Sequence, residues 1–242
     1  MKKSTLTWTA SAIATLVVMA IVTAPAFAGD YGEYDNWGTQ FTTNPLVCSG
    51  PNCSVTSMEM GIQPTGLVDR TETITMTGAP MGSMATGQTF LPGSGMCVTG
   101  NADGCLVFNN IGGANSSLIL NYAFHDLQTF SPNLGLQVTL ANTGAVQFDV
   151  TAYYKQGMNF TKIESALIPV GFNGIYTFDF ASNVSTDGIE IIYNDTNVAD
   201  ADGVLCCVMQ TPEIDPGSGM KALALLSGAL VVIRGRKKGT AV

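Results

Sequence analysis

Short runs of apolar and β-branched residues recur at about ten-residue intervals through the second half of the chain, and this rhythm limits the fold more than any other feature. Residues 145–154 illustrate it, because Val146, Phe148 and Val150 alternate with polar side chains. Turn-forming residues separate the runs. This spacing is typical of antiparallel β-sandwiches and barrels. The predicted strands are Cys105–Phe108, Leu118–Phe124, Leu134–Ala141, Ala145–Tyr154, Lys162–Val170, Ile175–Phe180, Ile189–Tyr193 and Val204–Met209.

The first half of the chain is less regular. Thr71–Thr77 alternates polar and apolar residues and is predicted to be a half-buried strand. Residues 78–96 are rich in glycine and methionine and are predicted to form a long loop. Residues 29–57 are predicted to be irregular, with room for one first strand. Together these segments predict an all-β fold, an antiparallel sandwich.

The first 28 residues have the layout of a secretory signal peptide. Lys2 and Lys3 precede an apolar stretch, and Ala26 and Ala28 form a cleavage site of the A-x-A type. The mature protein is therefore expected to begin near Gly29. An uncleaved membrane anchor is the alternative.

The C-terminal tail combines a short apolar run with a basic end. The 12 residues 222–233 carry no charge. As a helix they would cover about 18 Å, less than the hydrocarbon core of about 30 Å. Basic residues stay on the cytoplasmic side during export, so the tail is expected to halt transiently in the inner membrane. A permanent short anchor is the alternative. The basic residues at the end are Arg234, Arg236, Lys237 and Lys238.

The tail resembles the PEP-CTERM sorting signal of Gram-negative bacteria. Pro212 and Glu213 match the start of its Pro-Glu-Pro motif, whereas Ile214 departs from the third position and Pro216 comes two residues late. The resemblance implies processing by an exosortase, a membrane cysteine peptidase-transferase, and a place among exopolysaccharide-making bacteria. A glycine-rich tail of the rhomboid-sortase type is the alternative, because Gly217-Ser218-Gly219 is present.

These signals divide the chain into three parts. Residues 1–28 are the signal peptide, residues 29–211 the sandwich and residues 212–242 the sorting signal with its short hydrophobic helix.

The strand rhythm near the end of the sandwich, in "GIYTFDFASNVSTDGIEIIYND", resembles that of jelly-roll carbohydrate-binding and galactose-binding-like modules. That resemblance implies a jelly-roll-like sandwich.

The charge of the chain is distributed unevenly. Residues 29–220 hold all 18 acidic residues but only three basic ones, Arg70, Lys155 and Lys162, which gives a net charge of −15. A body this acidic repels nucleic acids and anionic membranes. It suits a solvated extracellular surface or one that binds cations.

The cysteines agree with export to an oxidising compartment. Cys48 and Cys53 flank one turn, and Cys97 and Cys105 flank another, so each pair is predicted to form a local disulfide. Six cysteines allow 15 connectivities, which leaves other pairings open. Cys206 and Cys207 are adjacent on a predicted strand, where side chains alternate in direction and do not readily bond each other.

No catalytic motif stands out. His125 is the single histidine, which excludes an H-E-x-x-H zinc peptidase, and no G-x-S-x-G motif is present. A glycosidase needs only two suitably spaced carboxylates, so that class stays open. The expectation is a protein without enzymatic activity.

An acidic loop between two predicted strands is the best candidate for a metal site. Asp195, Asn197, Asp200 and Asp202 offer the oxygen ligands that calcium prefers, and a glycine follows. The spacing differs from that of an EF-hand. The sequence predicts either a Ca²⁺ site here or a solvated acidic turn.

Three functions are compatible with these observations. The first is a non-enzymatic binding or structural component of an exopolysaccharide matrix at the cell surface. The second is a secreted carbohydrate-active hydrolase with paired carboxylates, and the third is a surface appendage subunit. Aromatic side chains either stack on sugar rings or pack in the core. The candidates are Tyr31, Tyr34, Trp37, Tyr153 and Tyr154.

Overall fold

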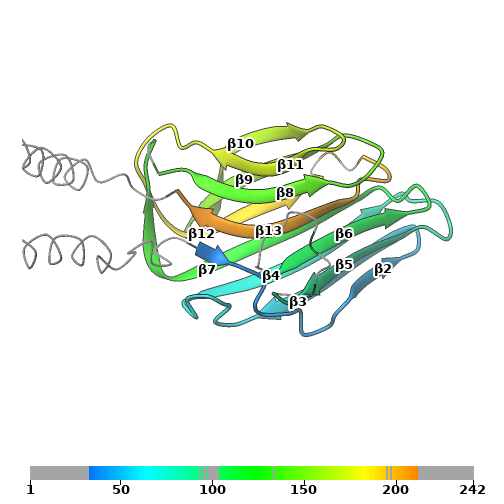
Figure 1. The fold of residues 1–242 in the computed structure, drawn as a ribbon, viewed down its shortest axis with the longest axis horizontal. Coiled ribbons are helices and arrows are strands. Elements are labelled where there is room, and N and C mark those ends of the chain that lie inside the picture. The colour runs from blue at the N-terminus through cyan, green and yellow to red at the C-terminus, as the bar shows by residue number, and fades with distance from the viewer. Residues whose placement is uncertain are drawn as a thin grey trace, which may run out of the picture.

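The computed structural model describes residues 33–211, apart from residues 93, 95, 96, 98–103, 133, 195 and 197. These residues form two antiparallel sheets whose strands run along the long axis of the domain (Figure 1). The predicted all-β sandwich is thereby confirmed. The strands are β1 (Glu33–Asp35), β2 (Leu46–Ser49), β3 (Asn52–Glu59), β4 (Val68–Thr77), β5 (Met84–Phe90), β6 (Cys105–Ile111), β7 (Ser116–Phe130), β8 (Leu136–Asn142), β9 (Phe148–Gln156), β10 (Asn159–Ile168), β11 (Asn173–Phe178), β12 (Val184–Tyr193) and β13 (Gly203–Gln210).

Each sheet takes strands from both halves of the chain. Sheet A has the order β11-β8-β13-β6-β5-β2, and β1 pairs with β13 at one end. Sheet B has the order β10-β9-β12-β7-β4-β3. The edges of sheet B are therefore β10 and β3.

Alternation along the strands creates the core between the sheets. On β4, Val68, Ile74 and Met76 point inward and are buried, whereas the threonines between them are partly exposed. β9 buries Phe148 and Val150 in the same way. The inner faces of both sheets contribute to one hydrophobic core.

The prediction of a long loop over residues 78–96 was wrong, because β5 lies within it. The sequence pattern does not predict this strand, because its inward positions include Ala85 and Gly87, which produce no alternation of large apolar and polar residues. A Cβ atom at Gly87 would lie 3.1 Å from the Cδ1 atom of Ile74. The small residues make room for large side chains from elsewhere in the core. The prediction for residues 29–57 also missed strands, since β1, β2 and most of β3 lie there, with β2 in sheet A and β3 in sheet B.

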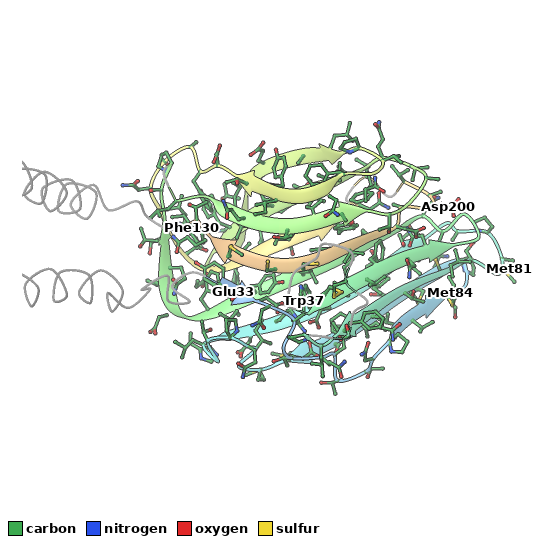
Figure 2. The ribbon with its side chains drawn as sticks, in the orientation of Figure 1. Glu33, Trp37, Met81, Met84, Phe130 and Asp200 are labelled. Atoms are coloured by element: carbon green, nitrogen blue, oxygen red, sulfur yellow. A yellow bond between two sulfur atoms is a disulfide. The ribbon has the colours of Figure 1, made fainter. Side chains whose placement is uncertain are left out.

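The two ends of the described chain lie together. Glu33 of β1 pairs with Met209 of β13, and β1 and the arrowhead of β13 lie toward the same end of the domain (Figure 1). Met81 and Asp200 lie at the opposite end (Figure 2). The predicted signal peptide and sorting signal fall outside the described residues. Within those residues, no helix is long and apolar enough to cross a membrane.

A buried arginine lies inside the sandwich. Arg70 points inward from β4, and its side chain is fully shielded from solvent. Its Nη1 atom donates to Asp35 Oδ2 at 2.5 Å, its Nε atom donates to Glu72, and its Nη2 atom donates to the Thr39 carbonyl at 2.9 Å. A buried guanidinium needs such partners, because an unpaired charge in the core is very costly.

Arg70 also holds the irregular segment that follows β1. Its guanidinium carbon lies 4.3 Å from the centre of the Trp37 ring and 5.6 Å from that of Phe41. Arg70 therefore contacts every second residue from 35 to 41, namely Asp35, Trp37, Thr39 and Phe41. Residues 36–41 belong to no strand, so contacts with Arg70 hold a segment that lacks the hydrogen bonds of a sheet.

Two more carboxyl groups complete the cluster around Arg70. Burial, and then a hydrogen bond with Glu59, raise the pKa of Glu72 to about 9. Burial alone would raise the pKa of Glu59, but hydrogen bonds from Glu72, Ser57 and the Thr42 amide outweigh it and lower that pKa. Glu72 is therefore protonated at neutral pH, and its O–H group donates a hydrogen bond to the Glu59 carboxylate.

The two predicted disulfides, Cys48–Cys53 and Cys97–Cys105, are present. The second lies on the outer face of sheet A, where Cys97 and Cys105 pack in a small apolar cluster with Cys206. Cys207 donates a hydrogen bond to Thr139. A register shift between residues 205 and 207 interrupts the alternation assumed for this strand, and the adjacent cysteines do not bond each other.

Replacing Arg70 by methionine should lower the free energy of unfolding by about 3–5 kcal/mol, because Asp35 loses its buried countercharge. Urea unfolding monitored by tryptophan fluorescence measures this change. Lys162→Met is the matched control, since it removes an exposed cation and should stay within about 0.5 kcal/mol of the wild type. Equal unfolding free energies for the two variants would contradict the role given to Arg70.

The proton on Glu72 makes stability depend on pH. Because the pKa is higher in the folded state, this contribution is fully present below the unfolded pKa and is lost as pH rises toward about 9. Glu72→Gln mimics the protonated acid and should flatten the decline in unfolding free energy across this window. Asp126→Asn, on the surface, should leave the decline in place. A decline of equal slope in Glu72→Gln would show that another group causes it.

Candidate functional site

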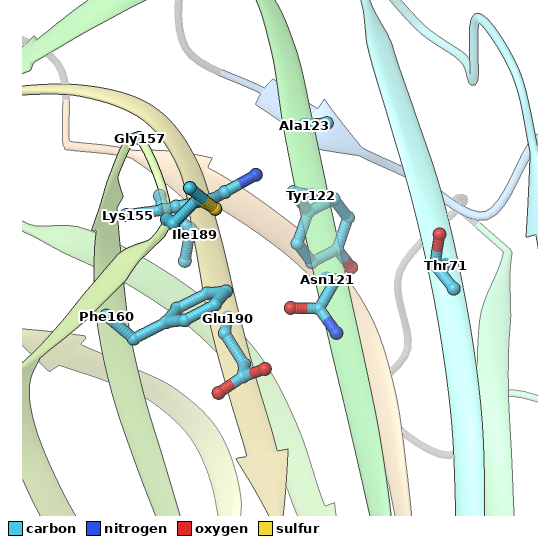
Figure 3. Close-up of a pocket in the computed structure, with 10 residues that line it drawn as sticks. Thr71, Asn121, Tyr122, Ala123, Lys155, Gly157, Phe160, Ile189 and Glu190 are labelled. Atoms are coloured by element: carbon cyan, nitrogen blue, oxygen red, sulfur yellow. The ribbon is translucent and has the colours of Figure 1, made fainter.

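A groove of about 600 Å³ lies on the outer face of sheet B, near the tip of the β9–β10 hairpin (Figure 3). Strands β4, β7, β12, β9 and β10 all contribute to it. Side chains of mixed chemistry meet there, including an aromatic ring, an amine, a carboxylate, an amide and a hydroxyl group. The lining residues are Thr71, Asn121, Tyr122, Ala123, Lys155, Gly157, Met158, Phe160, Ile189 and Glu190.

The strand register arranges six of these residues, together with four of their neighbours, in two rows that cross the sheet. Residues in a row are direct partners on neighbouring strands, and alternation turns them all to the outer face. The groove row consists of Asp69, Ala123, Gly188, Lys155 and Phe160. The polar row, two residues further along each strand, consists of Thr71, Asn121, Glu190, Tyr153 and Lys162.

The groove row has its smallest members, Ala123 and Gly188, in the middle. A Cβ atom at Gly188 would lie 2.5 Å from the Tyr122 carbonyl oxygen, so this position requires glycine. The register between β12 and β7 shifts here, because residues 124–127 of β7 lie opposite the single residue 187 of β12. The Thr186 hydroxyl stabilises this irregularity by accepting from the amides of Gly188 and Lys155 at 3.1 Å each. The local backbone thus fixes the groove floor.

The β9–β10 hairpin supplies one end of the groove. Gly157 has a φ of 63°, which suits the tight turn between the strands. Beyond the turn, Phe160 pairs directly with Lys155 and exposes 46% of its surface, with Glu190 beside it in the groove (Figure 3). An exposed ring on a rigid strand gives a flat apolar surface at little cost in conformational entropy.

The free cations of the described residues gather at this hairpin. Apart from buried Arg70, the described basic residues are Lys155 in the groove row and Lys162 in the polar row. Neither forms an ion pair within the part of the chain described. Their ammonium groups are thus available to donate hydrogen bonds to a ligand.

The chemistry of the groove suits recognition of hydroxyl groups. Lys155 donates, Glu190 accepts, and Asn121 and Thr71 do both, while Phe160 offers an apolar surface. Glu190 is the one carboxylic acid among the described lining residues. Hydrolysis by paired carboxylates needs two acids facing one bond, and the close pair Glu59–Glu72 is buried in the core. The groove therefore favours binding.

Sequence reasoning located the aromatic residues only in part. Trp37 and Tyr34 are buried in the core, so the idea that they stack on sugars was wrong. Tyr31 lies outside the described residues. Tyr153 lies in the polar row, whereas Tyr154 packs against the core. Phe160, Lys155 and Glu190 were missed because a groove that crosses five strands has no contiguous sequence signal.

The single histidine lies at the far end of the groove row. His125 Nε2 lies 3.1 Å from Asp69 Oδ1, and the same oxygen accepts from the Gly61 amide at 2.8 Å. Burial alone would raise the pKa of Asp69, but the Gly61 amide and then His125 lower it. This pair fastens the β3–β4 loop to β7.

The predicted calcium loop is described only in part, because Asp195 and Asn197 lie outside the described residues. Asp202 Oδ1 accepts from the Asn110 amide at 2.6 Å, and Asp200 Oδ1 accepts from the Gly113 amide at 2.8 Å. Among the described residues, no three His, Cys, Asp or Glu side chains are grouped closely enough to hold a metal ion. The calcium site therefore stays a prediction.

Comparisons with known proteins give little beyond these observations. No protein-family model matches the chain, and no curated protein matches it. Among solved structures, a family 29 carbohydrate-binding module has a TM-score of 0.31 and 12% identity, covering 44% of this chain and 68% of that one. A Ruminococcus gnavus GH29 fucosidase in complex with fucose has a TM-score of 0.30 and 8% identity, covering 39% of this chain and 17% of the enzyme. The assignment of fold and site follows from the strand pairing alone.

Calcium binding to the acidic loop would raise the melting temperature, because a ligand that binds only the folded state stabilises it. The measurement is thermal unfolding in millimolar calcium and in chelator. We expect a higher melting temperature in calcium, a smaller rise in magnesium, and a reduced calcium effect in Asp202→Asn. Asp126→Asn is the control and should respond as the wild type does. Equal melting temperatures in calcium and in chelator would show that the loop is a solvated acidic turn and not a calcium site.

Proposed function

We propose that the protein is an exported, non-enzymatic polysaccharide-binding protein of the bacterial cell surface or extracellular matrix. The groove on sheet B is the observation that carries this proposal. It combines an exposed ring, a floor of small residues and hydrogen-bonding groups of both kinds, which together match the apolar faces and hydroxyl edges of sugars.

The charge of the domain supports a ligand of this class. Nucleic acids and anionic membranes would be repelled by the acidic body, whereas a neutral polyhydroxylated ligand is indifferent to it. The two disulfides agree with a location outside the reducing cytoplasm.

The route to the surface belongs to the same proposal. The signal peptide directs export, and the tail with Pro212, Glu213 and its basic end is processed by an exosortase after a transient stop in the inner membrane. The intact mass of protein recovered from the cell surface tests this step. A chain that ends before residue 221 supports it, and a chain that retains Val242 contradicts it.

Binding is tested with the exported protein on an array of bacterial polysaccharides, followed by calorimetry on the best ligand. Ala123→Trp fills the groove floor from an exposed position and should lower affinity at least about ten-fold. Phe160→Ala removes the stacking surface and should lower it by a similar factor.

The matched control is Ser54→Trp, which adds the same side chain to the same outer face on β3, away from the groove. It should bind as the wild type does. Melting temperatures of all variants establish that they fold. Retained affinity in Ala123→Trp would place the ligand elsewhere, and release of sugar from the ligand would reveal an enzyme.

A further inference from the structure

The groove runs across the strands of sheet B. Its floor follows the groove row from Lys155 over Gly188 to Ala123, and the polar row follows the same direction beside it. A ligand that fills the floor and meets Glu190 and Asn121 in succession must therefore lie perpendicular to the strands.

The site is longer than a single sugar needs. The lining residues extend from Phe160 on β10 to Thr71 on β4, which are separated by four strand spacings. At about 4.8 Å for each spacing, this distance is about 19 Å. Hydrogen-bonding groups occur on successive strands along it, so the site offers several separate positions for sugar rings.

Among the described residues, the strand order puts no wall at either end of the groove. At one end, Phe160 lies on β10, which is the edge strand of sheet B. At the other, the partner of Thr71 on the last strand is Met58, whose surface is 56% exposed. A site that bound a chain terminus would need a wall at one end, and the strand order supplies none.

From this geometry we propose that the site binds an internal segment of an uncharged polysaccharide, several sugars long, which crosses β10, β9, β12, β7 and β4. This inference rests on the proposed function. One sugar stacks on Phe160 at the sheet edge, and the next lies over Gly188 and Ala123 between Lys155 and Glu190. The sugars that follow lie over β7 and β4, where they form hydrogen bonds with Asn121 and Thr71.

A series of oligosaccharides cut from the bound polysaccharide tests this inference. Affinity measured by calorimetry should rise at least ten-fold from the disaccharide to a length of about four sugars and then level off. Reducing the terminal sugar of the polysaccharide to an alditol should leave its affinity unchanged, because internal segments carry the binding.

Variants at the two ends of the groove separate the positions. Phe160→Ala should lower affinity for every oligosaccharide, including the shortest. Thr71→Trp blocks the far end from a partly exposed position, so it should remove the gain from added length and leave short ligands unaffected. Ser54→Trp, on the neighbouring strand, should change neither.

The outcomes distinguish this inference from the proposed function. Equal affinity for a monosaccharide and a long chain, with loss of binding after terminal reduction, would indicate recognition of a chain end and would overturn the inference alone. Affinity that is lost when the carboxyl groups of the polymer are reduced would show that the ligand is anionic, which also overturns it. Failure to bind any polysaccharide would overturn the proposed function itself.

Discussion

The ionic interactions of Arg70 are the constraint on which the rest of the structure depends. One fully buried cation faces Asp35, Glu59 and Glu72, so the cluster would carry two excess negative charges if every acid were ionised. The proton on Glu72 removes one of them, and the hydroxyl of Tyr122 adds a hydrogen bond to Asp35 at 3.1 Å. One excess negative charge remains, and hydrogen bonds to Asp35 and Glu59 stabilise it. The N-terminal segment is fixed by these contacts, because Asp35 and the Thr42 amide belong to it.

The buried cluster and the groove share two strands. On β4, Arg70 and Glu72 point into the core on either side of Thr71, which faces the groove. On β7, Tyr122 points inward between Asn121 and Ala123. The same backbone therefore anchors the interior and presents the binding surface. A preorganised surface of this kind loses little entropy when a ligand binds.

The sequence allowed prediction of the sandwich where local patterns are strong. The strands from Cys105 onward were recognisable because apolar residues alternate and turn residues separate them. β5 was not, since its inward positions are the small residues Ala85 and Gly87 and the polar Thr89. The Arg70 cluster has members from four separated segments, and the groove rows depend on register between strands. Such features follow from pairing between distant residues, which a single sequence does not specify locally.

The position of β13 within sheet A affects how the domain would respond to mechanical load. β13 lies in the interior of sheet A, with β8 on one side and β6 on the other. A pull transmitted through the chain after Thr211 would act along this strand, while its backbone hydrogen bonds lie across it. The hydrogen bonds on both sides of β13 would then all be loaded in shear at the same time, and they would not break one after another. A tethered domain built in this way would withstand drag from a polymer held on its opposite sheet.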